Sequence, residues 1–174
     1  MAVHPIIEVP DPRLRTISSP VAEVTAETRT LIADMFETMY AAKGIGLAAI
    51  QIGVPQRILV IDLQEEGPEG KPVNAPRVFI NPEIVEEAPE RSVYTEGCLS
   101  VPDQFADVER PATCRARWLD ADGTAHDEVI EGLLATCLQH EMDHLEGIIF
   151  IDHLSRLKRE MVLKKLNKAR KAAA

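Results

Sequence analysis

Two histidines four residues apart, in the segment His140-Glu141-Met142-Asp143-His144, restrict the fold of this chain more than any other pattern in it. On a helix, residues four apart lie on one face about one turn from each other, so both imidazoles can bind a single metal ion. Glu141 then projects beside the ion, where it can act on water instead of binding the metal. The pattern therefore predicts a metal-binding helix that starts near residue 131 and ends before residue 147.

The apolar residues around this motif predict that the histidines face the protein interior. Leu133 and Cys137 extend the histidine stripe, and Leu134, Leu138 and Leu145 form an apolar stripe beside it. Two surface histidines on an amphipathic helix are the simpler alternative. Buried imidazoles and a buried carboxylate need polar partners, however, and a metal ion supplies them.

The third ligand is less clear from the residues alone. A catalytic site of this type takes three protein ligands and keeps one position open. One metalloprotease class supplies a third histidine, but Phe150 stands at that position here. The remaining candidates are Glu160, His153, Cys137 on the helix itself, and Cys98. Three ligands from one straight helix would converge poorly, and spacing alone does not prove any of the others.

Two rival functions follow from these open choices. A different metalloamidase or protease would need another third ligand than Cys98. A metal-stabilised binding module without catalysis would need four protein ligands and would not need Glu141. Cys114 is the spare candidate for a fourth ligand, although nothing near it has ligand spacing.

The rest of the chain predicts an α+β fold, with small antiparallel or mixed sheets around the metal-binding helix and a further helix at the C-terminus. We expect a first helix over residues 26–43, capped by Thr25 and ended by Gly44. Strands are expected at 57–63, at 78–81 where Pro82 stops it, and at 112–119 and 125–130 as a hairpin. Residues 67–76 and the segment around Cys98 are expected to be loops.

Length and composition indicate one catalytic domain over residues 1–174, with a basic C-terminal helix over residues 155–174. No apolar run approaches the roughly 18 residues of a membrane span, and no signal pattern starts the chain, so we expect a cytoplasmic protein. Three widely spaced cysteines argue against a disulfide framework. The net charge is −9, yet residues 156–171 hold eight Lys/Arg and one acid. The acidic body should repel nucleic acid, whereas the basic helix could attract it.

Three motifs give the chain a resemblance to peptide deformylases. They are Gly44-Ile45-Gly46-Leu47-Ala48-Ala49-Ile50-Gln51, Glu96-Gly97-Cys98-Leu99-Ser100, and Gln139-His140-Glu141-Met142-Asp143-His144-Leu145-Glu146-Gly147. Their order and spacing also match, and the similarity spans nearly the whole chain. The resemblance implies removal of the formyl group from the N-terminal formyl-methionine of newly synthesised proteins, with release of formate.

The resemblance also implies roles for single residues. Cys98, His140 and His144 are expected to bind one divalent metal, typically Fe²⁺, with Zn²⁺, Ni²⁺ or Co²⁺ able to replace it. Glu141 is the expected acid and base, and the Gln51 side chain and the Leu99 N–H are expected to polarise the formyl oxygen. The residues expected near the substrate and its methionine pocket are Ile45, Gly46, Glu96, Gly97, Leu133 and Cys137.

Partners follow from the same resemblance. It implies formyl-methionyl nascent peptides as substrates and a contact of the basic C-terminal helix with the ribosome, but no DNA and no membrane. One position departs from the pattern, because Phe105 stands where several bacterial relatives carry arginine, while Arg110 matches. The departure concerns the peptide beyond its first residue, not the chemistry.

Overall fold

The computed structural model describes all 174 residues and contains three α-helices and seven β-strands. Their bounds are α1 Ala26–Ala41, β1 Gly46–Ala48, β2 Ile58–Ile61, β3 Arg77–Glu87, β4 Arg91–Cys98, β5 Val101–Pro111, β6 Thr113–Leu119, β7 Ala125–Glu131, α2 Gly132–Leu145 and α3 Arg156–Ala173. Three short 3₁₀ helices cover Pro12–Arg15 (η1), Ala49–Ile52 (η2) and Phe150–His153 (η3). No helix combines the length and hydrophobicity that crossing a membrane requires.

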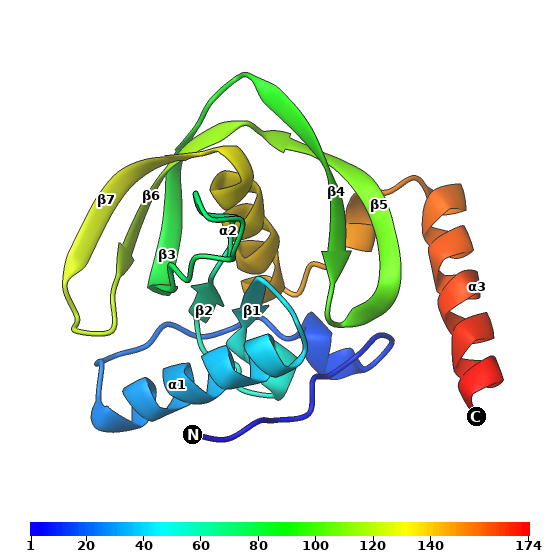
Figure 1. Cartoon of the computed structure of the whole chain (residues 1–174), viewed down its shortest axis with the longest axis horizontal. Helices are drawn as coiled ribbons and strands as arrows, with labels where there is room; N and C mark the ends of the chain where they lie inside the picture. The colour runs from blue at the N-terminus through cyan, green and yellow to red at the C-terminus, as the bar shows by residue number, and fades with distance from the viewer.

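The strands form two antiparallel sheets on either side of α2. One has five strands in the order β1-β2-β3-β6-β7, and the other is the two-stranded hairpin β4-β5. Figure 1 shows α2 between the two sheets, α1 on the far side of the five-stranded sheet near β1 and β2, and α3 outside the β4-β5 hairpin. The predicted α+β fold, with small sheets around the histidine helix, is confirmed.

Strand β2 explains how the five-stranded sheet is covered on both faces. Leu59 and Ile61 lie in a core cluster with Leu138 of α2, whereas Ile58 and Val60 lie in a second cluster with Met35 of α1. Successive side chains of a strand point to opposite faces, so an unbroken apolar run belongs to a strand that is buried on both. The run thereby fixes α1 and α2 on opposite sides of the sheet.

A third core cluster joins the β4-β5 hairpin to the C-terminal helix. Val101 and Val108 of β5 pack with Phe150 and with Val162 and Leu166 of α3. These two buried positions of α3 lie four residues apart on one face of the helix. The helix is therefore attached to the protein along one apolar stripe, and its other faces meet solvent.

Two predicted element ends differ from the structure. Helix α1 begins after its predicted cap Thr25, but the left-handed residue at its end is Lys43, with φ 59°, and not Gly44. The N–H groups of Lys43 and Gly44 donate to the carbonyls of Tyr40 and Met39, which closes the last turn one residue earlier than predicted.

The strand predicted to stop at Pro82 was also too short. Strand β3 continues from Arg77 to Glu87, with a register shift between Ile80 and Glu83 and a positive φ at Asn81. At such a bulge the pairing is already interrupted, so the missing N–H of Pro82 removes no ladder hydrogen bond.

The loop predicted around Cys98 is wrong as well. Cys98 is the last residue of β4, and Pro102 is the second residue of β5. Both strands belong to a hairpin that pairs continuously from Arg91 with Pro111 to Gly97 with Phe105, and the register then shifts so that Cys98 pairs with Val101.

Candidate metal centre and active site

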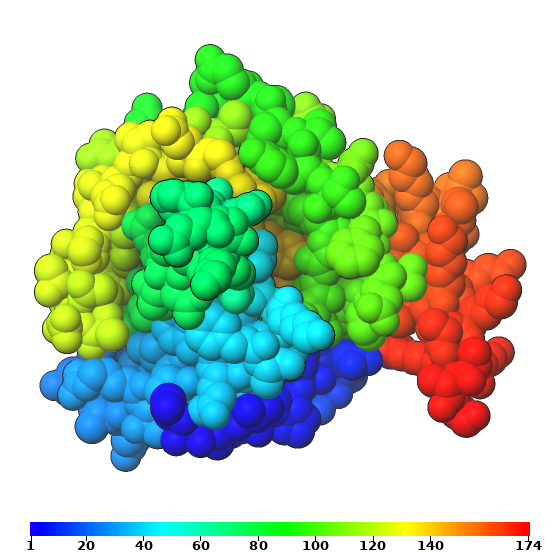
Figure 2. All heavy atoms as spheres, in the orientation of Figure 1, coloured from blue at the N-terminus to red at the C-terminus, as the bar shows by residue number.

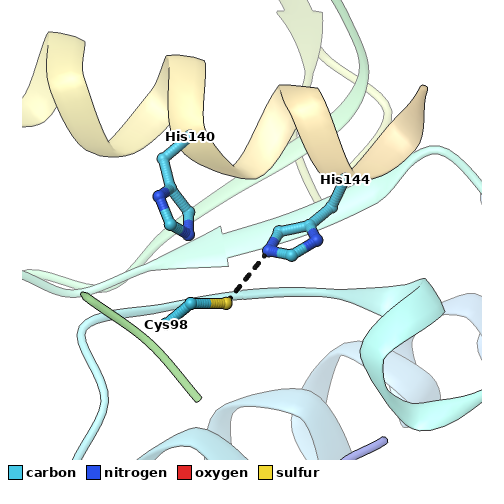
Figure 3. Close-up of side chains that lie close together, drawn as sticks. All are labelled: Cys98, His140 and His144. Atoms are coloured by element: carbon cyan, nitrogen blue, oxygen red, sulfur yellow. Dashed lines mark hydrogen bonds between the residues drawn. The ribbon is translucent and has the colours of Figure 1, made fainter. Parts of the chain in front are cut away.

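Cys98, His140 and His144 meet in space, although they come from different elements. Their ligand atoms all lie within 4.8 Å of one another, and the Cys98 Sγ lies 3.3 Å from the His144 Nε2. Figure 3 shows both imidazoles extending from α2 toward the sulfur of Cys98. The tight turn between β4 and β5 places Cys98 next to the two histidines. The N–H of Val9 holds this turn by donating to the Ser100 carbonyl at 2.9 Å.

The other candidates for the third ligand lie elsewhere. His153 Nε2 bonds the Asp143 carboxylate at 2.7 Å, and Glu160 pairs with Arg156 on the exposed side of α3. Cys114 lies on β6, and its side chain is buried in the core cluster that contains Leu138 of α2. Phe150, at the position where one metalloprotease class has its third histidine, stacks on the His140 ring with centroids 6.0 Å apart. This position therefore supplies a packing contact and no ligand.

Glu141 is buried beside the three residues. Its Oε1 lies 3.8 Å from His140 Nε2, and its Oε2 is buried without a hydrogen-bond partner. Burial raises the pKa of this carboxyl to about 7. A carboxyl whose pKa lies near neutrality can both accept and donate a proton at physiological pH.

The residues present fit a divalent metal ion. A thiolate and two imidazoles are donors that zinc and other first-row divalent metals accept, with a further position left for water or substrate. Burial lowers the pKa of His144 well below its ordinary value, so this imidazole stays neutral, as a metal ligand must. The unpartnered Glu141 Oε2 also points to a polar group that completes the site.

A buried ion pair orients His140 from behind. The His140 Nδ1 lies 2.9 Å from the Glu96 carboxylate, and two guanidinium N–H groups of Arg110 donate to the same carboxylate at 2.7 and 3.0 Å. Burial alone would raise the pKa of Glu96, but the hydrogen bonds from His140 and Arg110 outweigh it and lower that pKa. With Nδ1–H donating to Glu96, the Nε2 of His140 is left free for a metal.

Gln51 is held in one orientation next to Cys98. Its Oε1 accepts the N–H of Ala48 at 2.9 Å, and its Nε2 donates to the Ser100 Oγ at 3.0 Å and lies 3.6 Å from the Cys98 Sγ. These bonds fix which end of the amide faces the cysteine. The side chain therefore presents N–H and not C=O toward the site.

Gly44, just before β1, and Gly46, the first residue of β1, let this segment approach the site closely. A Cβ on Gly46 would lie 2.8 Å from the Glu141 Oε1, and one on Gly44 would lie 2.6 Å from the Leu99 Cδ1. A larger residue at Gly46 would push against the Glu141 carboxylate, and one at Gly44 would push against the Leu99 side chain.

These residues form one wall and the floor of a cleft of about 620 Å³. Figure 2 shows it as a hollow between the segment coloured cyan to teal and the green β4-β5 hairpin, with α2 visible at its bottom. The predicted site residues that line it are Ile45, Gly46, Gln51, Glu96, Gly97, Cys98, Leu99, Leu133, Cys137, His140 and Glu141. His144 lies behind them and is fully buried. Burial raises the pKa of the Cys137 thiol to about 12, so it stays protonated in the cleft wall.

The similarity of this chain to known proteins identifies its family. The polypeptide deformylase family profile matches residues 3–160. This chain belongs to the peptide deformylase family. A peptide deformylase from Rhizorhabdus wittichii is 72% identical over 173 residues, which cover 99% of this chain and 98% of the relative. Peptide deformylases are metal-dependent hydrolases, and the Cys98, His140 and His144 group agrees with that dependence.

Solved deformylase structures share the fold as well as the sequence. The crystal structure of peptide deformylase from Ehrlichia chaffeensis has a TM-score of 0.92 and 41% identity, and the match covers 99% of both chains. The same enzyme in complex with actinonin has a TM-score of 0.89 and 43% identity over 97% of this chain and 98% of that one.

Sequence reasoning missed part of this deformylase site. It placed Glu96 near the substrate, and Glu96 does line the cleft, but it did not predict that the Glu96 carboxylate bonds His140 and Arg110. It gave no role to Arg110, to Asp143, which accepts from Arg110 at 2.9 Å, or to Ser100. Glu96 and Arg110 are fourteen residues apart on paired strands, so no helical or local spacing connects them.

Proposed function

We propose that this chain hydrolyses the N-formyl group of N-terminal formyl-methionine on newly synthesised proteins and releases formate. The observation that carries the proposal is the meeting of Cys98, His140 and His144 beside a buried Glu141 whose Oε2 has no partner. Membership of the peptide deformylase family supports the same reaction.

Cys98, His140 and His144 would hold the metal. A divalent ion bound there lowers the pKa of its water toward about 7 and so makes a nucleophile available at neutral pH. We infer Fe²⁺ as the native ion, and the same donors accept Zn²⁺, Ni²⁺ and Co²⁺. Glu96 and Arg110 keep His140 turned toward this position.

Glu141 is the proposed proton carrier. Water adds to the formyl carbon as Glu141 takes its proton, and the C–N bond breaks as Glu141 passes that proton to the amine. The products are formate and a free N-terminal methionine. General acid and base help of this kind contributes about 10²–10⁴-fold to a rate.

Two donors are proposed to stabilise the negative charge on the formyl oxygen. They are the Gln51 Nε2, whose orientation the Ala48 N–H and Ser100 hydroxyl fix, and the backbone N–H of Leu99. Donors that are fixed before the reaction need no rearrangement when the charge develops, and losing one costs about 10²–10³-fold.

The cleft suits an extended peptide. Strand β1 pairs only with β2, and β4 pairs only with β5, so each strand has a free edge and both line the cleft. A peptide can add to such edges by main-chain hydrogen bonds. We propose that Ile45, Gly46 and Gly97 contact its backbone, and that Leu133 and Cys137 form the wall of the methionine pocket.

The whole chain would act as one catalytic domain in the cytoplasm, with α3 as a docking element for the ribosome. Val162 and Leu166 attach α3 to the core, and Lys164, Lys165 and Lys168 are exposed to solvent. A basic exposed face suits the anionic surface of ribosomal RNA.

The test is formate release from formyl-Met-Ala-Ser by anaerobically purified protein, together with its metal content. Cys98→Ala should lose both bound metal and formate release, whereas Cys114→Ser, a matched change in the core, should keep both. Metal loss from Cys114→Ser, or a wild type that binds one metal and releases no formate, would support a binding module instead.

A further inference from the structure

Phe105 is the most exposed aromatic side chain of this protein. It is 66% exposed, while Phe79 and Phe150 are buried and Phe36 is partly buried. It lies on β5 and lines the same cleft as Cys98 and Glu141. An apolar ring that stays in water at the edge of a cleft is typical of a surface that binds an apolar group.

Part of the Phe105 ring is held against the neighbouring strand. Phe105 pairs with Gly97 across the hairpin, and a Cβ on Gly97 would lie 2.5 Å from the Phe105 Cε1 and 2.6 Å from its Cδ1. The Cδ1–Cε1 side of the ring therefore fills the space over the bare backbone of Gly97, as aromatic side chains cover glycines in paired strands. This contact fixes the ring but leaves most of it open to solvent, so a second group can pack on it with little loss of freedom.

The position of the ring relates it to the substrate beyond methionine. Gly97 directly precedes Cys98, and cross-strand neighbours lie about 4.5–5.5 Å apart, so Phe105 stands close to the metal ligand. An extended peptide advances about 3.4 Å per residue. When the formyl group is at the metal position, the second and third residues of the peptide therefore lie within reach of this ring. Ile45, 38% exposed, lines the same cleft from β1's side, so apolar groups are present on both walls.

We propose that Phe105 is a specificity-determining residue that favours an apolar side chain at the second or third position of the formyl-methionyl substrate. The proposal rests on the deformylase function proposed above. The apolar side chain leaves water when it packs on the open part of the ring, and this contact needs no charge on either partner.

The test compares kcat/KM for formate release from three peptides: formyl-Met-Ala-Ser, formyl-Met-Leu-Ser and formyl-Met-Ala-Phe. In the wild type, at least one apolar peptide should exceed formyl-Met-Ala-Ser by about 5–10-fold, less than the full effect of a closed apolar pocket. Phe105→Ala should reduce that ratio to below about twofold, and Phe105→Leu should keep most of it, because an apolar side chain remains.

A matched control and metal content separate this role from a structural one. Val129→Ala changes a similarly exposed apolar residue on β7, outside the cleft, and should leave the ratio unchanged. If Phe105 only covered Gly97, Phe105→Ala would slow all three peptides equally at unchanged ratio, and that result would overturn the proposal. Equal rates on the three peptides in the wild type would overturn it too, whereas no formate from any peptide at full metal content would contradict the deformylase function itself.

Discussion

Glu96 and Arg110 form an ion pair directly behind His140, and both side chains are almost completely buried. Buried pairs of this kind add little net stability, but removing one partner leaves the other charge without compensation. Here the pair has a further consequence, because Glu96 also sets which nitrogen of His140 faces the metal position.

Glu96→Gln tests this orienting role. The amide keeps the size of the side chain but loses the charge that holds both His140 and Arg110, so metal affinity should fall about 10–100-fold. Competition with a chromogenic chelator measures it. Glu109→Gln is the control, because Glu109 is 61% exposed and pairs with Arg91 on the same hairpin at 3.8 Å. Equal affinities in the two variants would show that Glu96 does not orient His140.

Two glycines should respond differently to alanine. At Gly46 the added Cβ meets the flexible end of Glu141, so Gly46→Ala should change the free energy of unfolding little and lower kcat by more than about tenfold. At Gly147 it meets the backbone carbonyl of Arg15 at 2.6 Å, and φ is +72°. Gly147→Ala should therefore lower the free energy of unfolding by about 1–3 kcal/mol. Urea denaturation measures the stability of each variant, and formate release measures its kcat. A larger loss of stability in Gly46→Ala than in Gly147→Ala would contradict these contacts.

Among the helices and strands, the sequence predicted the ones whose burial leaves a local pattern of apolar residues. Strand β2 is apolar throughout because both its faces are covered, and α2 carries two adjacent stripes because it lies between two sheets. The β4-β5 hairpin leaves no such pattern. Gly97 and Pro102 indicate a loop locally, but the pairing of Phe105–Pro111 with Arg91–Gly97 and the packing of β5 against α3 outweigh that preference.

The end of α1 offers a test at this scale. Lys43 adopts φ 59°, a left-handed conformation that costs a residue with a Cβ about 1 kcal/mol relative to glycine. Lys43→Gly should therefore raise the free energy of unfolding by about 0.5–1 kcal/mol in urea denaturation. Lys43→Ala keeps the Cβ and should give no such gain. A loss of stability in the glycine variant would mean that the Lys43 side chain, not the backbone, matters there.

At the scale of the whole molecule, the site exists only because distant segments meet. Cys98 and His144 are 46 residues apart, and Gln51 and Cys98 are 47 apart. The helical spacing of His140 and His144 predicts two ligands from the residues alone. The third candidate ligand depends on the hairpin, which local pattern did not predict, so the residues alone left Cys98 an unproven candidate and the resemblance assigned it.

The exposed lysines of α3 are the residues that we expect to contact the ribosome. Deleting α3 would also remove Val162 and Leu166 from the core, so charge reversal is the better test. Changing Lys164, Lys165 and Lys168 to Glu should abolish co-sedimentation with ribosomes at low salt and leave formate release intact, because these side chains are exposed and lie outside the cleft.

A matched variant separates net charge from location. Changing Arg29, Lys71 and Arg91 to Glu alters the net charge equally at exposed positions outside α3, and this protein should still co-sediment. Equal loss in both variants would assign any binding to overall charge, and equal retention would mean that α3 does not dock.

Formate release by Glu141→Gln, measured together with metal content, tests most directly whether Glu141 carries the proton. The glutamine keeps the size of the side chain but cannot carry the proton, so turnover of formyl-Met-Ala-Ser should fall by about 10²–10⁴-fold. The three ligands are unchanged, so one metal ion per chain should remain bound. Turnover close to that of the wild type, at equal metal content, would contradict the assignment of Glu141 as the group that moves the proton.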